Sequence, residues 1–333
     1  MRRLEDINWY PAIESAESSL NAKVGRALTP RTECWLWAQW RLPEVTHGGM
    51  PYFDPDISIA KGLRVIAHGL APCFGGRGND PHLWKEGFTA MFDEFKRLRP
   101  YMYGETAKYS ALLVSQQMRD FHDSKTMWNA VGRLEDIHRA EHLLTDVIFD
   151  DSLTLKRLSP YPVVVLANST CLSDAQCEVL GDYVRGGGTL LATGESSLYD
   201  EWGDRRENFG LSELLGVNYV ETREEGSQIL VPQTEELREE FERFVTFVSP
   251  AVHITLRDDA GTEVLFTHSS RAIHGLSVKE DAYDSDVPAI LRRRIGEGTV
   301  YYIGPDIGHG YGRDNLPRVA QLVGWLERDG AEP

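Results

Sequence analysis

Strand-like and helix-like stretches alternate along the first hundred residues. The helix-like stretches repeat apolar positions at helical spacing, and they are SAESSLNAKVGRAL, ISIAKGLRVIAHGL and HLWKEGFTAMFDEFKRL. The strand-like stretches are DINWY, PRTECWLW and APCFGG. This alternation predicts βα units on a parallel sheet. The stretch PYMYGE at residues 100–105 then breaks the periodicity, and we interpret it as a domain boundary.

The alternation resumes after this boundary. Strands are predicted at YSALLVS, VIFD, PVVVLAN and TLLAT, and helices at TMWNAVGRLEDIHRAEHLL and SDAQCEVLGDYVR. The apolar run at residues 163–166 is typical of a central parallel strand covered on both faces. Ser173 and Gln176 form a capping-box pattern at the start of the second helix. The pattern predicts an open, doubly wound α/β sheet.

The pattern changes at about residues 222–285, which we interpret as an α+β insertion. It contains the acidic helical stretch EELREEFERFVTF and the short strands HITLRD and TEVLFTH. The chain then returns through a hairpin, AILRRRIGEGTVYYIG, to a closing helix, NLPRVAQLVGWLERD. We therefore expect two domains, residues 1–105 and residues 106–333.

Composition excludes some partners. The formal net charge of −16 opposes binding to nucleic acid and to anionic membranes, which both require clustered Lys and Arg. No apolar run is long enough for a signal peptide or a membrane span, so a cytoplasmic protein is expected. Cys34, Cys73, Cys171 and Cys177 lack metal-binding spacing, which favours structural thiols and predicts no metal and no cofactor.

Two short motifs suggest chemistry, and both have simpler explanations. HRAEH at residues 138–142 has the spacing of a zinc-peptidase helix, but no third ligand is recognisable, so we interpret the histidines as edge residues beside an apolar stripe. That stripe comprises Val131, Leu134, Ile137 and Leu144.

Ser196 follows a strand where a nucleophile elbow would lie, with His309 as a distant base. The second glycine of an elbow is missing, which favours a helix N-cap serine and a loop histidine.

Glu33 is the candidate catalytic residue. It lies in TPRTECWLWAQW, beside Trp35, Trp37 and Trp40. A carboxylate at the carboxyl end of a barrel strand stabilises the oxocarbenium-like carbon in sugar chemistry, and aromatic faces hold the sugar ring. The alternative is a solvated glutamate among core tryptophans.

The chain after residue 105 resembles the β-galactosidase trimerisation-type domain, in the version found in proteins described as "hypothetical glycosyl hydrolase 6". The resemblance covers residues 106–333 and rests on VVVLAN, LSDAQ, YVRGGGTLLATGE, SLYDEWG, FGLSELLGV and the closing hairpin. It implies a flavodoxin-like domain built like class I glutamine amidotransferases, without catalysis of its own, that assembles as a homotrimer. Glu195 and Ser196 stand where a glutaminase would have its cysteine.

Residues 1–105 resemble the last βα units of a (β/α)8 barrel. DINWYP, PRTECWLW and AHGLAPCFGG are similar to its sixth, seventh and eighth strands, which implies that Glu33 is the nucleophile by position. About five βα units and the general acid expected on the fourth strand have no counterpart here. We therefore predict a glycoside hydrolase-related protein that hydrolyses O-glycosidic bonds. The alternative is a non-catalytic oligomerisation or carbohydrate-binding protein derived from a glycosidase.

Overall fold

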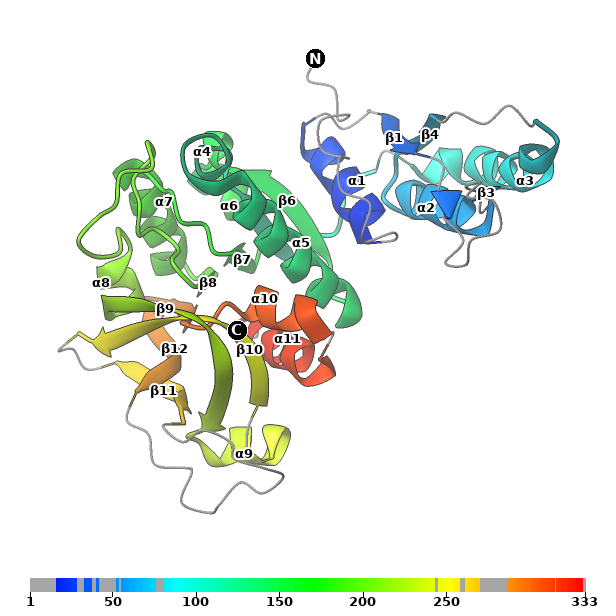
Figure 1. Cartoon of the computed structure of the whole chain (residues 1–333). Coiled ribbons are helices and arrows are strands. Elements are labelled where there is room, and N and C mark those ends of the chain that lie inside the picture. The colour runs from blue at the N-terminus through cyan, green and yellow to red at the C-terminus, as the bar shows by residue number, and fades with distance from the viewer. Residues whose placement is uncertain are drawn as a thin grey trace. The chain divides into compact units, whose positions relative to one another are not determined.

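The computed structural model divides into two compact units, Met1–Thr106 and Ala107–Pro333 (Figure 1). The structure describes residues 16–28, 33–37, 40–41, 52–53, 55–75, 81–102, 104–242, 245–257, 261–269, 287–314 and 316–331. Among these residues, each unit has its own sheets, and no sheet runs through both units. Each unit therefore has its own backbone hydrogen-bond ladder.

The first unit contains the three helices that the apolar periodicity predicts, and short strands between them. The helices are α1 (Ala16–Leu28), α2 (Pro55–Ala67) and α3 (Pro81–Leu98). The strands are β1 (Glu33–Trp37), β2 (Trp40–Arg41), β3 (Tyr52–Phe53) and β4 (Ala71–Gly75). β1 pairs with β4 in parallel, and β2 pairs with β3 antiparallel. The predicted strand DINWY lies outside the described residues.

Helix α2 forms the centre of the described part of the first unit, because it packs against both α1 and α3. Val65 of α2 is fully buried with Ala22 of α1 and with Leu70, which precedes β4. The neighbouring Ile66 packs with Met91 of α3. Apolar residues at adjacent positions of α2 thus face two different helices and hold the βα order in place.

The second unit contains one mixed sheet. Its strands are β5 (Ser110–Val114), β6 (Thr145–Phe149), β7 (Val163–Leu166), β8 (Thr189–Thr193), β9 (Val217–Pro232), β10 (Val245–Leu256), β11 (Thr262–His268), β12 (Pro288–Ile295) and β13 (Gly298–Ile303). Among the described residues, the strand order is β10-β9-β11-β12-β13-β8-β7-β5-β6. The five strands from β13 to β6 are parallel, and the remaining pairs are antiparallel.

Helices cover both faces of the parallel part. Every residue of β5, β7 and β8 is buried, which confirms the prediction of central strands made from residues 163–166. One face packs on α7 (Asp174–Arg185), together with the short helices α6 (Leu155–Leu158) and α8 (Ser212–Leu215). The other set of helices comprises α5 (Ser124–Ala140), α10 (Ile307–Asp314) and α11 (Pro317–Ala331). The predicted capping box of Ser173 and Gln176 is present at the start of α7.

The segment predicted as an α+β insertion contributes strands to the main sheet. It contains a short helix, α9 (Glu235–Phe241), but the predicted helical stretch 235–247 is too long, because β10 begins at Val245. The long strand β9 begins at Val217, and β9, β10 and β11 extend the sheet through β12. Residues 270–286 of this segment lie outside the described residues.

A buried histidine in this antiparallel part predicts a pH-dependent stability. His268 of β11 is 7 % exposed and stacks on His253 of β10 with ring centroids 5.0 Å apart. Burial, and then the neighbouring His253 and Arg223, lower the pKa of His268 to about 4, because the charged ring is disfavoured there. The unfolded chain binds a proton near pH 6.5, so folding loses stability as the pH falls from 6.5 towards 4.

We expect this histidine to remove about 2 kcal/mol of unfolding free energy between pH 7.5 and pH 5. Urea denaturation of the chain and of His268→Phe across this range measures the effect. The phenylalanine keeps a planar ring and cannot titrate, so its stability should fall less steeply with pH. Identical slopes for the two proteins would contradict the expectation.

Candidate functional site

Three adjacent parallel strands of the second unit end at one cavity. Asn168 follows β7, Glu195 follows β8, and Asp306 follows β13. Because β7 pairs with β8 and β8 pairs with β13, the carboxyl ends of these strands meet at one edge of the sheet. Ligand sites of open α/β sheets lie at this edge. The cavity has a volume of about 540 Å³, which is within the range of small-molecule sites.

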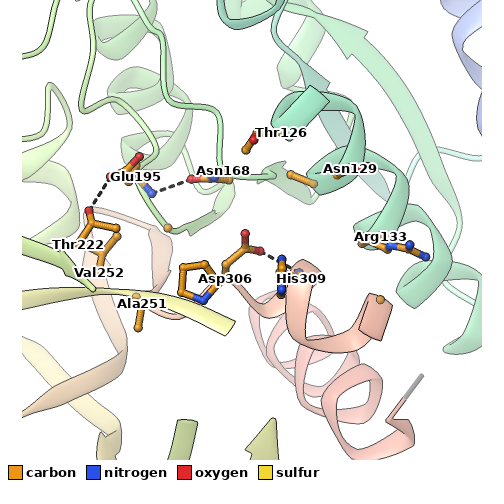
Figure 2. A pocket seen from close by; sticks show the side chains of 15 residues that line it. Thr126, Asn129, Arg133, Asn168, Glu195, Thr222, Ala251, Val252, Asp306 and His309 are labelled. Atoms are coloured by element: carbon orange, nitrogen blue, oxygen red, sulfur yellow. Dashed lines mark hydrogen bonds between the residues drawn. The ribbon is translucent and has the colours of Figure 1, made fainter. Parts of the chain in front are cut away.

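Other elements complete the walls of the cavity. Figure 2 shows Asn168, Glu195 and Asp306 around the same space, with Thr126, Asn129 and Arg133 of α5 along one side and His309 of α10 beside Asp306. Thr222 of β9 and residues 250–252 of β10 close the remaining side. The antiparallel strands that join the main sheet therefore contribute directly to this cavity.

Glu195 is held by two hydrogen bonds. Its backbone N–H donates to Oδ1 of Asn168 at 2.8 Å, and its carboxylate accepts from the hydroxyl of Thr222 at 2.5 Å. Gly194 makes this arrangement possible, since its φ is +58° and an added Cβ would lie 2.5 Å from Oδ1 of Asn168. Asn168 itself has a φ of +48°, a region that asparagine tolerates better than most residues.

Asp306 caps the start of α10. Its Oδ1 accepts the backbone N–H of His309 at 2.9 Å. Burial raises the pKa of the Asp306 carboxyl, whereas the backbone N–H and the charge of His309 lower it. The charge of Glu195 raises this pKa to a lesser extent, and the N–H of Gly308 lowers it. The cavity is thus lined by two carboxylates, Glu195 and Asp306.

Ser196 and His309 do not form a catalytic dyad, in line with the missing second glycine of an elbow. Ser196 is fully buried, and its hydroxyl donates to the carbonyl of Thr193 at 2.7 Å and accepts from the backbone N–H of Ser169. His309 lines the cavity, but its Nε2 lies 3.6 Å from a carboxylate oxygen of Glu225 and makes no hydrogen bond to the serine. The interpretation of Ser196 as a helix N-cap is wrong, since Ser196 lies in a turn. The interpretation of His309 as a loop residue is wrong as well, since His309 lies within α10.

The histidines of HRAEH do not share a site. His138 is fully buried and hydrogen-bonded to Glu327 of α11, while His142 lies beyond the end of α5 with a φ of +57°. The prediction that both histidines lie at the edge of the stripe is wrong for His138. Val131, Leu134 and Ile137 are buried as predicted, but Leu144 is 58 % exposed. The described residues contain no group of three His, Cys, Asp or Glu placed to hold a metal ion.

For the candidate sugar site of the first unit, the structure describes the backbone only. Glu33 is the first residue of β1, with Trp35 and Trp37 further along the same strand, and Trp40 begins β2 in another sheet. The side chains of these residues lie outside what the structure describes. Glu33 therefore opens its strand and does not lie at the carboxyl end, where the barrel pattern predicts it.

Cys73, Cys171 and Cys177 are not in disulfides. Cys171 is buried, and Cys73 and Cys177 are partly buried, while the side chain of Cys34 lies outside the described part. Burial raises the pKa of the Cys177 thiol to about 12, so it stays protonated at neutral pH. Of the helices in the described residues, none is both long and apolar enough to cross a lipid bilayer.

Fold and site together define a mixed α/β protein with a polar cavity at the carboxyl edge of its parallel strands. The family model of the β-galactosidase trimerisation domain matches residues 119–324, and the chain belongs to this family. This confirms the resemblance seen in the sequence. None of the curated proteins matches the chain.

Solved glycosidases share the fold of both units. The chain is similar to the β-galactosidase of Bacillus circulans sp. alkalophilus, with 15% identity, a TM-score of 0.67, and coverage of 95% of this chain and 49% of that one. The chain is also similar to an exo-β-1,4-mannosidase from Opitutaceae bacterium strain TAV5, with 13% identity and a TM-score of 0.60. This match covers 96% of this chain and 57% of the mannosidase. An α-L-fucosidase from Paenibacillus thiaminolyticus matches with 15% identity and a TM-score of 0.61, over 94% of this chain and 47% of the fucosidase. The chain thus spans about half the length of these structures.

Proposed function

We propose that the chain acts in carbohydrate metabolism as part of a glycoside hydrolase that cleaves O-glycosidic bonds. The observation that supports this most directly is the extent of the structural similarity, because glycosidases match between 94% and 98% of the chain. A shared assembly domain alone would match only the second unit. The similar structures act on different sugars by their names, so the fold leaves the sugar and the linkage open.

This proposal includes a finer description of the two units. The parallel strands of the second unit run β6-β5-β7-β8-β13, which is the 2-1-3-4-5 order of flavodoxin-like sheets, and this supports a flavodoxin-like, amidotransferase-like domain. The parallel pair of β1 and β4, with α2 and α3 following in turn, supports βα units of a (β/α)8 barrel. In this proposal the second unit holds three copies together as a homotrimer.

Within this assembly, Glu33 acts as nucleophile or as the carboxylate that stabilises the oxocarbenium-like carbon. Trp35, Trp37 and Trp40 hold the sugar ring. A second carboxylate is required as general acid, and another segment or another copy supplies it.

The second candidate is a non-catalytic oligomerisation or carbohydrate-binding protein. The position of Glu33 favours it, because catalytic groups of barrel enzymes lie at the carboxyl ends of the strands, and Glu33 opens β1. In this case the chain binds carbohydrate or holds an assembly together without turnover.

Hydrolysis of aryl galactosides, fucosides, mannosides and arabinosides by the purified chain tests the proposal. Under the enzymatic proposal, we expect turnover that falls at least 1,000-fold, on the order of 4 kcal/mol in the barrier, in Glu33→Gln. Glu105→Gln changes an exposed glutamate of the same unit and is the matched control. Light scattering of the same samples measures the mass.

The possible outcomes separate the candidates. Turnover that survives Glu33→Gln removes Glu33 from the reaction, and a trimer without turnover favours the non-catalytic candidate. A stable monomer would contradict the homotrimer in either case.

A further inference from the structure

Two aromatic side chains of the second unit lie in contact with each other and remain exposed to solvent. Phe121 is 49 % exposed and Trp202 is 65 % exposed, and their rings meet edge to face with centroids 5.3 Å apart. They are the aromatic members of the exposed apolar side chains described in residues 107–333. Large aromatic rings that stay in water forgo the free energy of burial, so two of them in contact indicate a binding surface.

Trp202 lies at the tip of a tight hairpin, residues 199–205. The first and last residues of this hairpin pair as an antiparallel bridge, and the N–H of Asp200 donates to the carbonyl of Asp204 at 2.9 Å. Oδ1 of Asp200 accepts the backbone N–H groups of Trp202 and Asp204, each at 2.9 Å. The backbone at Trp202 is therefore fixed before a ligand binds, which lowers the entropic cost of binding.

Phe121 lies on a π-helical turn, Arg119–Asp123, that leads into α5. Such turns are rare and occur frequently at functional sites. The hairpin contacts this turn at two points. The ring of His122 packs on that of Tyr199 with centroids 4.3 Å apart, and the backbone of Gly203 lies against the carbonyl of Phe121. Gly203 has a φ of +83°, and a Cβ there would lie 2.3 Å from that carbonyl oxygen, so glycine is required for this close approach.

The residues beside the two rings favour a sugar over a protein partner. Asp120 precedes Phe121 and Glu201 precedes Trp202, so carboxylates adjoin a small apolar area. Stable protein interfaces use about 20 to 30 residues on each side and exclude charged groups from their centre. A pyranose ring has one C–H face that packs on an aromatic ring, and hydroxyl groups that donate to carboxylates at its rim. An acidic sugar would be repelled by these carboxylates and by the net charge of −16.

We propose that Phe121 and Trp202 form a surface that binds a neutral sugar ring of a polysaccharide. The sugar stacks on the indole of Trp202 with Phe121 beside it. Stacking does not require one pattern of hydroxyl groups, so the surface accepts β-linked hexoses of more than one kind. The inference rests on the carbohydrate ligand of the proposed function, and it does not depend on catalysis by Glu33.

Native electrophoresis of the full chain in gels that contain a soluble β-galactan or a soluble β-mannan tests this surface. The chain migrates because of its net charge, and a neutral polysaccharide that binds it retards it. We expect retardation in at least one of the two gels. Trp202→Ala should raise the dissociation constant about fivefold or more, whereas Trp202→Phe, which keeps an aromatic face, should retain part of the binding. Phe121→Ala should weaken binding about twofold or more.

The substitutions leave the hairpin intact, because Trp202 is bonded to Asp200 through its backbone N–H. Thermal melting of each variant checks the fold. Leu155→Ala removes another exposed apolar side chain of the second unit and should leave the retardation unchanged.

Three results would overturn the proposal. The first is retardation in neither gel, and the second is retardation that Trp202→Ala and Phe121→Ala leave unchanged. The third is a lower oligomeric mass of Trp202→Ala in light scattering, which would assign the two rings to a contact with a second copy of the chain. Retardation measures binding and not turnover. A retarded chain that cleaves no aryl glycoside contradicts the glycosidase proposal alone, and a chain that cleaves aryl glycosides without retardation contradicts this surface alone.

Discussion

Replacing Glu327 with alanine is expected to lower the free energy of unfolding by about 3 kcal/mol or more. Glu327 of α11 and His138 of α5 are both fully inaccessible to solvent and bonded to each other. Removing the carboxylate leaves the Nε2 of His138 without its partner inside the core. Nδ1 of His138 already lacks a hydrogen bond, so the ring would then be buried with neither nitrogen satisfied. Urea denaturation monitored by tryptophan fluorescence measures the loss.

The neighbouring residue of the same helix provides the control. Arg328 is bonded to Glu141, the residue after α5, at 2.7 Å, but its side chain is 48 % exposed. Arg328→Ala should therefore cost less than about 1 kcal/mol. Glu327→Gln, which keeps an oxygen acceptor, should fall between the two variants. A loss in Glu327→Ala no larger than that in Arg328→Ala would show that the buried pair contributes little.

The same pair explains why HRAEH misleads. Helical spacing predicts that residues four apart share a face, and that holds only while the helix continues. Here α5 ends at Ala140, so His142 has left the helix. The partner of His138 lies 189 residues further along the chain, and no local pattern contains it. The apolar positions Val131, Leu134 and Ile137 were predictable because burial alone determines them.

Most of the parallel sheet follows from local signals, and the antiparallel part does not. β7 is a run of apolar residues bounded by turns, and α7 carries its own capping box. β9, by contrast, is mostly exposed over residues 220–225, where glutamate and arginine dominate. Its pairing with β10 supplies the backbone ladder that defines it as a strand. Propensity and periodicity contain little information about such a strand.

The candidate site is a product of strand order. Asn168, Glu195 and Asp306 are far apart in the sequence and meet because β7, β8 and β13 are neighbours in the sheet. Asn168 ends a predicted strand, and Glu195 and Asp306 closely follow predicted strands. This position is the signal that would have found Asn168 and Asp306. At the elbow-like position, the sequence pattern indicates Ser196 and not its neighbour Glu195, and Ser196 is buried in backbone hydrogen bonds.

The turn at Gly296–Gly298 was predicted as a hairpin, and the structure shows that one glycine in it is sterically fixed. Gly298 opens β13, and a Cβ there would lie 2.0 Å from the carbonyl oxygen of Val184 and 2.4 Å from that of Gly188. Both atoms are backbone, at the end of α7 and in the loop before β8. We therefore expect Gly298→Ala to lower the free energy of unfolding by about 3 kcal/mol, because the hairpin and α7 must move apart.

A second strand glycine separates this steric effect from the general effect of alanine. Gly226 lies in β9, where a Cβ would meet only the carbonyl oxygen of Glu224 at 3.9 Å. Gly226→Ala should leave the stability within about 0.5 kcal/mol of the parent, since alanine reduces the entropy of the unfolded chain and meets no obstacle. Chemical denaturation of both variants measures the two changes in unfolding free energy. If Gly298→Ala is no less stable than Gly226→Ala, then α7 does not press against the hairpin, and the link between the parallel and antiparallel parts is looser than the contacts indicate.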